Sequence, residues 1–123
     1  VYSYAMCYWE EQSWLPSKSI HAAEFLHGTL EIVEETTPVT LFLGEDEQRV
    51  LSERVAKLLP KICSNYTLID TKDYPVEGIS EKYRGRVLSF LLMHAVTQRI
   101  DAHVEQLNCH PLEIRRYYRQ FDY

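Results

Sequence analysis

The sequence of 123 residues contains no apolar run that approaches the ~20 residues of a membrane-spanning helix. Its first residues also lack the basic and then apolar pattern of a secretory signal. Basic residues are outnumbered, with 13 Lys and Arg against 18 Asp and Glu. The net charge of −5 disfavours a nucleic-acid partner, because phosphate backbones favour clustered cations. We therefore expect a cytoplasmic protein with neither a membrane nor a nucleic-acid partner.

Cysteine, glycine and proline are also scarce, with three, four and five residues respectively. The three cysteines are widely spaced and form no Cys-x-x-Cys pair, so the simplest interpretation is free thiols in a reducing compartment. His21, Glu24 and His27 would lie at positions i, i+3 and i+6 of a helix, where three ligands diverge by about 60° per step. No His-Glu-x-x-His motif is present either. We predict no metal and no other cofactor.

Aromatic residues are abundant, with nine tyrosines, several of them near the ends of the chain. Residues of this type line pockets and also fill subunit contacts, so both roles stay open. The length allows at most one domain with a core of modest depth.

Hydrophobic periodicity and the prolines divide the chain into alternating helices and strands. The expected elements, in order, are a helix over 1–14 that stops before Pro16, a connection over 16–25, a short helix or turn over 28–35, a strand over 39–44, a helix over 45–63, a strand over 66–70, a helix over 80–107 and a tail. The helix over 45–63 carries an apolar stripe made of Val50, Leu51, Val55, Leu58, Leu59 and Ile62. The acidic residues 45–47 are interpreted as its start, favoured by the helix dipole.

Strands that alternate with helices predict parallel crossovers and an α/β fold. Two strands alone are too few for an independent parallel sheet. Because the chain also begins with valine, inside a predicted helix, we infer the C-terminal portion of a larger α/β protein. An intact small α+β domain with further, unrecognised strands is the alternative.

Residues 10–34, EEQSWLPSKSIHAAEFLHGTLEIVE, resemble the active-site segment of the sugar isomerase (SIS) superfamily. That segment has a helical glutamate and, sixteen residues later, a histidine followed by glycine, which Glu11, His27 and Gly28 match. Residues 24–33, EFLHGTLEIV, are more similar to the fructoselysine-6-phosphate and glucoselysine-6-phosphate deglycases of that superfamily. LFLGEDEQR at 41–49 and HPLEIRRYYRQFDY at 110–123 resemble the same enzymes, so the resemblance covers most of the chain.

The resemblance implies an α/β fold, the C-terminal part of an SIS-type three-layer αβα sandwich with a parallel sheet, incomplete in this chain. Residues 1–107 would form that part, and residues 108–123 a tail that closes the active site or docks on a neighbouring subunit. A missing N-terminal part of the same protein would supply the Ser/Thr-rich loops that hold the sugar phosphate. A homodimer is expected.

The resemblance also implies roles for individual residues. Glu11 matches the glutamate that moves a proton between adjacent sugar carbons, and His27 matches the histidine that exchanges protons with ring and hydroxyl oxygens. The residues assigned to substrate binding are Glu24, His21, Arg115 and Tyr117. For Glu24 and His21 the alternative is a purely structural role, and for the tail residues it is subunit docking.

The implied activity is deglycation of a phosphorylated amino sugar by Glu/His acid–base proton transfer and imine hydrolysis. Synthase-type members of the superfamily carry a lysine in the tail, whereas no lysine follows Lys82 here, which favours a deglycase. The alternatives are a phosphosugar aldose–ketose isomerase and a non-catalytic SIS module that binds a sugar phosphate and regulates a partner.

Overall fold

The computed structural model describes residues 1–122, which divide into two compact units. The terminal unit comprises Val1–Ser19 and Ala95–Tyr123, and the central unit comprises Ile20–His94. Tyr123, the last residue of the predicted tail, lies outside the described residues. No helix among residues 1–122 combines the length and apolar character that crossing a membrane requires.

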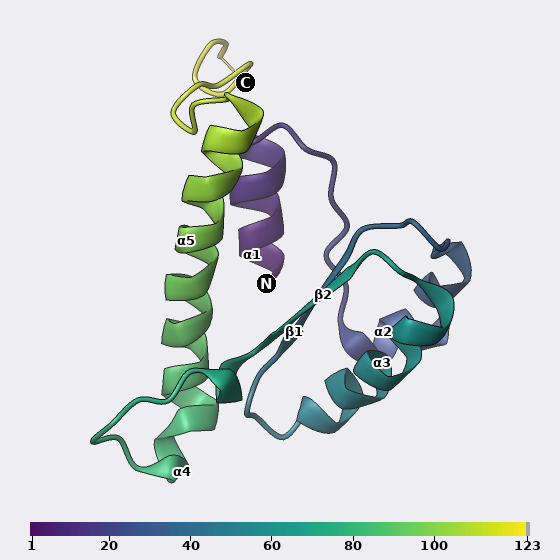
Figure 1. Cartoon of the computed structure of the whole chain (residues 1–123). Helices are drawn as coiled ribbons and strands as arrows, with labels where there is room; N and C mark the ends of the chain where they lie inside the picture. Colours follow the sequence, from purple (N-terminus) through teal and green to yellow (C-terminus); the bar gives the residue numbers. More distant parts are fainter. Residues whose placement is uncertain (123) are drawn as a thin grey trace. The chain divides into compact units, whose positions relative to one another are not determined.

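The central unit contains a parallel sheet of two strands, β1 (Val39–Leu43) and β2 (Tyr66–Asp70). The helix α3 (Arg49–Ile62) connects them, so the predicted strand–helix–strand crossover is confirmed (Figure 1). Pro60 lies in the last turn of α3, which ends two residues later at Ile62.

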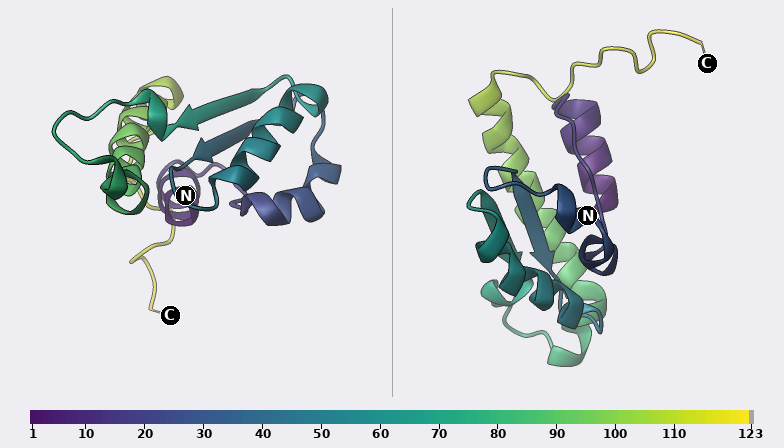
Figure 2. Two further views of the ribbon diagram at one scale, coloured as in Figure 1. Left: turned by 90° about the horizontal axis from the view of Figure 1, so that it is seen from below. Right: turned by 90° about the vertical axis from the view of Figure 1, so that its right-hand side faces the viewer.

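The core of the central unit lies between α3, the sheet and α2 (Ala22–His27), which packs against α3 (Figure 2). Phe25, Val55 and Leu59 are its buried residues. Val50, expected in the apolar stripe of α3, is 59% exposed. Leu51, Val55 and Leu59 follow one another at four-residue spacing, whereas Val50 is rotated by about 100° from that row.

The helix α2 corrects the prediction of a connection over 16–25. His21 caps it, since its Nδ1 accepts from the backbone N–H of Ala23 at 3.2 Å. Two alanines, the best helix-forming residues, follow the cap and explain why the chain becomes helical there. The short 3₁₀ helix η2 (Thr29–Ile32) then confirms the helix or turn expected over 28–35.

Beyond β2, a 3₁₀ turn η3 (Thr71–Asp73) leads to a long helical stretch. It consists of α4 (Glu81–Tyr83), the π-helical η4 (Arg84–Leu88) and α5 (Ser89–Asn108), which confirms the helix predicted over 80–107.

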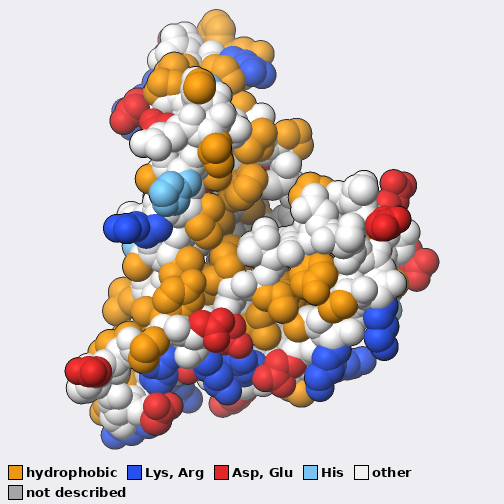
Figure 3. Space-filling view, viewed as in Figure 1, with side chains coloured by type: hydrophobic (Ala, Val, Ile, Leu, Met, Phe, Trp, Pro, Cys, Tyr) orange, Lys and Arg blue, Asp and Glu red, His pale blue; other side chains and the backbone are white. Residues whose placement is uncertain are grey.

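Acidic and basic side chains intermingle around α4 and the start of α3 on the face drawn in Figure 3. The apolar residues of the long helical stretch are only partly covered, because Leu88 is buried whereas Val87 and Leu91 are exposed.

The terminal unit contains one N-terminal helix, α1 (Tyr2–Tyr4) continued by the π-helical η1 (Ala5–Gln12), which confirms a helix before Pro16. The Tyr4 hydroxyl donates to Asp101 Oδ1 at 2.8 Å and so ties this helix to α5. Burial raises the pKa of the Asp101 carboxyl, and the bond from Tyr4 partly opposes that shift. Within residues 109–122 the tail forms turns without a helix or a strand.

Candidate active site

Glu11 lies on η1 and is held by a residue of the tail. The Nε of Arg115 donates to Glu11 Oε1 at 2.9 Å. The Nη1 of the same guanidinium donates to the backbone carbonyls of Leu112 and Ile114. Among the described residues, Glu11 Oε2 and Arg115 Nη2 make no hydrogen bond, so each remains free to meet a ligand.

A cavity of about 380 Å³ opens beside this ion pair. Its volume lies near the lower end of the range for small-molecule sites. Both carboxylates of η1 and four consecutive tail residues contribute to the wall. The lining residues are Glu10, Glu11, Trp14, Leu15, Pro16, Arg115, Arg116, Tyr117 and Tyr118.

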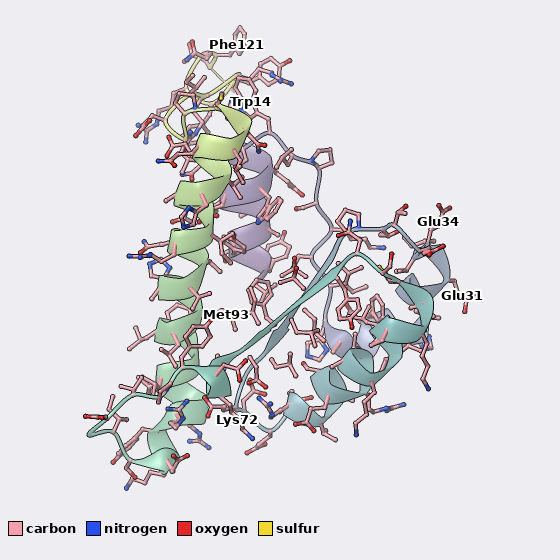
Figure 4. All side chains as sticks on the ribbon, in the orientation of Figure 1. Trp14, Glu31, Glu34, Lys72, Met93 and Phe121 are labelled. Carbon is pink, nitrogen blue, oxygen red and sulfur yellow. The ribbon has the colours of Figure 1, made fainter. Side chains whose placement is uncertain are left out.

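Trp14, which is labelled in Figure 4, lines the cavity and has an unusual backbone conformation. Its φ of 56° lies in the left-handed region, which a bulky residue rarely adopts and which costs about 1–3 kcal/mol. The backbone N–H of Leu15 donates to the carbonyl of Trp9 at 2.7 Å and holds this turn. The ring of Trp14 contacts the ring of His110 and the guanidinium of Arg116, each at 4.3 Å.

A second polar group lies on α2 in the central unit. His21, Glu24 and His27 are all exposed, whereas Phe25 between them is buried in the core. Glu24 and His27 lie three residues apart and therefore share one face of the helix. Because His21 Nδ1 accepts a backbone hydrogen bond, its Nε2 carries the proton in the neutral ring.

The structure thus brings together the predicted site residues in two groups. Glu11, Arg115 and Tyr117 line one cavity of the terminal unit. His21, Glu24 and His27 share one short helix of the central unit. The pairing of Glu11 with His27 stays a prediction, as do the substrate-binding roles. Within residues 1–122, no cluster of three or more His, Cys, Asp or Glu side chains has the arrangement of a metal site.

One polar cluster was not predicted from the sequence. Glu45 was expected to start a helix, but it lies in a largely buried ion pair with Arg84, whose Nε donates to Oε1 at 2.7 Å. The hydroxyls of Thr71 and Ser89 donate to Oε2 at 3.0 and 3.3 Å. The Arg84 guanidinium therefore holds the pKa of the Glu45 carboxyl below its usual value.

Sequence position offers a signal for this cluster. Glu45 follows β1 by two residues and Thr71 follows β2 directly, and the carboxyl ends of parallel strands meet at one edge of a sheet. A second cavity of about 380 Å³ lies there, lined by Glu45, Lys72, Pro75, Val76, Glu77, Glu81 and Arg84. Figure 4 labels Lys72 at this end of β2. Since Nε and Nη2 of Arg84 donate to Glu45 and to the carbonyls of Thr71 and Tyr74, we interpret the cluster as a structural clamp.

No protein-family model matches the sequence. Among characterised proteins, the chain is 34% identical over all 123 residues to the fructosamine deglycase FrlB of Bacillus subtilis and covers 37% of it. It is also 38% identical over 60 residues to the fructoselysine 6-phosphate deglycase of Escherichia coli. Those residues make up 49% of this chain and 18% of that enzyme. The chain therefore spans only a minor part of these relatives.

Solved structures also match nearly all of this chain but only a minor part of their own length. A proposed phosphosugar isomerase from Bacillus subtilis superposes with a TM-score of 0.94 at 34% identity, covering 99% of this chain and 37% of the other. A second one, from Salmonella typhimurium, superposes with a TM-score of 0.88 at 28% identity, covering 97% and 36%. The resemblance to SIS proteins and to their deglycases is confirmed, and the α/β fold is part of an SIS fold.

Proposed function

Because this chain is similar over its whole length to a fructosamine deglycase, we propose that the protein carrying it releases the amine from a phosphorylated amino sugar. One observation carries the proposal: Glu11, the residue that matches the motif glutamate, lies on a cavity wall with one oxygen fixed by Arg115. Its second oxygen makes no hydrogen bond within residues 1–122 and is therefore available to a substrate proton.

The chemistry is a proton transfer followed by hydrolysis. Glu11 removes a proton from the sugar carbon that bears the amine, while His27 gives a proton to the neighbouring carbonyl oxygen, which yields an enaminol. Glu11 returns its proton to the neighbouring carbon, and the double bond moves to the carbon–nitrogen pair as a protonated imine, whose N–H proton returns to His27. Water adds to that carbon, the amine leaves with a proton, and an aldose phosphate remains.

The residues of α2 would support these proton transfers. We assign His27 as the acid that faces the sugar oxygens, with Glu24 on the same helical face to orient it. His21 caps the helix through Nδ1 and keeps its Nε2 proton for a substrate oxygen. Tyr117 and the free Nη2 of Arg115 are assigned to substrate contacts in the cavity.

Replacement of the proposed base tests the function. In the complete protein, Glu11→Gln keeps the size and the Arg115 contact but cannot take up a proton. We expect amine release from a fructosamine 6-phosphate to fall at least about 10²-fold, while binding measured by calorimetry persists. Glu34→Gln is the control, because Glu34 is exposed and points into solvent (Figure 4). Undiminished turnover in Glu11→Gln would refute the assignment.

A phosphosugar aldose–ketose isomerase is the second candidate, favoured by the two proposed isomerases that share this fold. Both reactions need the same proton transfer, so the two functions are distinguished by which substrate is turned over. An isomerase interconverts a ketose phosphate and an aldose phosphate without release of an amine. Wild-type protein that binds a sugar phosphate but turns over neither substrate would instead indicate a regulatory module.

The assembly is also part of the proposal. This chain covers 37% of its Bacillus subtilis relative, and the sheet within residues 1–122 has two strands, which supports a further part of the same protein that completes the sheet and holds the phosphate. We place the enzyme in the cytoplasm as a homodimer whose tail, residues 108–123, closes the active site or docks on the partner. Sedimentation of the complete protein tests the dimer.

A further inference from the structure

We propose that Arg116 binds a carboxylate on the amine half of the substrate, and so selects sugars linked to an amino acid. The inference rests on the proposed function, since it gives the cavity beside Glu11 a specific ligand. Arg116 lines that cavity next to Arg115, but the two guanidinium groups have different surroundings.

Arg115 is neutralised by Glu11, whereas Arg116 has no anionic partner among the described residues. The contact that holds Arg116 is with Trp14, whose ring centroid lies 4.3 Å from the guanidinium carbon. A guanidinium stacked on an aromatic ring is fixed in orientation but keeps its N–H groups free at the edge. Those paired donors match the two oxygens of a carboxylate.

The platform beneath Arg116 is itself held in place. Trp14 adopts a left-handed φ of 56°, and the His110 ring packs against it at 4.3 Å. Such a conformation persists only where its surroundings enforce it. The result is a rigid aromatic surface that fixes Arg116 on the same cavity wall as Glu11.

The charges around the cavity fit an amino acid. The proposed reaction beside Glu11 breaks the bond between the sugar carbon and the nitrogen of the amine half. Groups attached to that nitrogen must therefore lie near Glu11 during the reaction. Arg116 supplies a cation for the carboxylate of an amino acid. Glu10, whose Oε1 accepts from Ser17 at 2.9 Å, supplies an anion for a second ammonium group.

The sugar phosphate is the other anion that Arg116 can bind. A pair of substrates, one with and one without the carboxylate, distinguishes binding of the carboxylate from binding of the phosphate. The fructosamine 6-phosphates of glycine and of methylamine differ only in the carboxylate. Binding is measured by calorimetry and turnover by amine release, in the complete wild-type protein and in Arg116→Met. Arg119→Met is the matched control, because Arg119 stacks on Tyr118 at 5.3 Å but does not line the cavity.

We expect Arg116→Met to weaken binding of the glycine compound roughly ten- to hundredfold and to leave the methylamine compound unchanged. Equal loss for both compounds assigns Arg116 to the phosphate and overturns the proposal, as does no loss for either. Binding is read independently of turnover. If the wild type binds the glycine compound selectively yet releases no glycine, the proposed function fails while the carboxylate site stands.

Discussion

The Nε of Arg115 donates to Glu11 Oε1 across 2.9 Å and joins two residues that lie 104 positions apart in the sequence. The guanidinium is itself anchored, because its Nη1 donates to two carbonyls of the tail, those of Leu112 and Ile114. The guanidinium, anchored by these two carbonyls, fixes one oxygen of the Glu11 carboxylate, whereas Oε2 makes no hydrogen bond within residues 1–122. Arg115 is therefore expected to position Glu11 as well as to meet the substrate through Nη2.

Arg115→Ala tests this positioning. The carboxylate then loses its anchor, and a displaced catalytic group can cost up to about 10²-fold in rate. We expect kcat for amine release to fall about ten- to hundredfold with a smaller change in KM. Added guanidinium ion should restore part of the lost kcat, which no loss of folding would allow.

Arg119→Ala serves as the control for Arg115→Ala, because Arg119 lies in the same tail, stacks on Tyr118 and does not line the cavity. A raised KM with unchanged kcat and without guanidinium rescue would show that Arg115 acts only in substrate binding.

Gly85 leads to a second prediction, which concerns stability. A Cβ added there would lie 2.6 Å from the carbonyl oxygen of Glu45, and the Glu45 side chain is fixed by its ion pair with Arg84. We expect Gly85→Ala to lower the unfolding free energy of the complete protein by about 1–3 kcal/mol in urea titrations. Alanine normally stabilises a helix relative to glycine by up to about 1 kcal/mol, so the clash reverses the sign.

Gly28→Ala is the matched control for Gly85→Ala. No atom lies within 4 Å of a Cβ at Gly28, and its φ of −165° lies outside the left-handed region that favours glycine. Its unfolding free energy should stay within about 0.5 kcal/mol of the wild type. Equal destabilisation by both substitutions would show that the close approach of η4 to Glu45 is not the cause.

The strand–helix–strand unit of the central unit was predictable from the sequence. Residues 39–44 and 66–70 are runs of β-branched and apolar residues, and α3 between them repeats its core positions at helical spacing. The start of α2 was not predicted. Its cap is a histidine, which sequence rules do not include among the usual capping residues, and its six residues are too few to show a period.

The polar interactions were harder to predict than the elements. Glu45 precedes α3 and so has the pattern of an ordinary acidic helix start, but its partner Arg84 lies 39 residues away. Glu11 and Arg115 are farther apart still. Such pairs depend on how the backbone folds back on itself. The family resemblance predicted a role for Glu11, but only the structure shows that Arg115 holds its side chain.

The last prediction concerns acid stability of the central unit. Arg84 lowers the pKa of Glu45, and Arg49 lowers that of Asp70 through a hydrogen bond of 2.9 Å from its Nη1. A carboxyl group with a lower pKa in the folded state binds its proton more readily when unfolded. Its stabilising contribution is therefore present above the unfolded pKa, about 4 for these groups, and is lost as the pH falls through the folded value.

We expect the unfolding free energy to decrease as the pH falls from 6 to 3, and to decrease less steeply in Glu45→Gln, which has no proton to gain at that position. Urea unfolding at several pH values measures both slopes. Glu34→Gln is the control, since this exposed residue should leave the slope unchanged. The comparison between variants cancels the contributions of other carboxyl groups to the slope. These include Asp101, whose raised pKa acts in the opposite direction. Equal slopes in Glu45→Gln and wild type would contradict a folded-state ion pair between Glu45 and Arg84, because that pair is what separates the folded from the unfolded pKa.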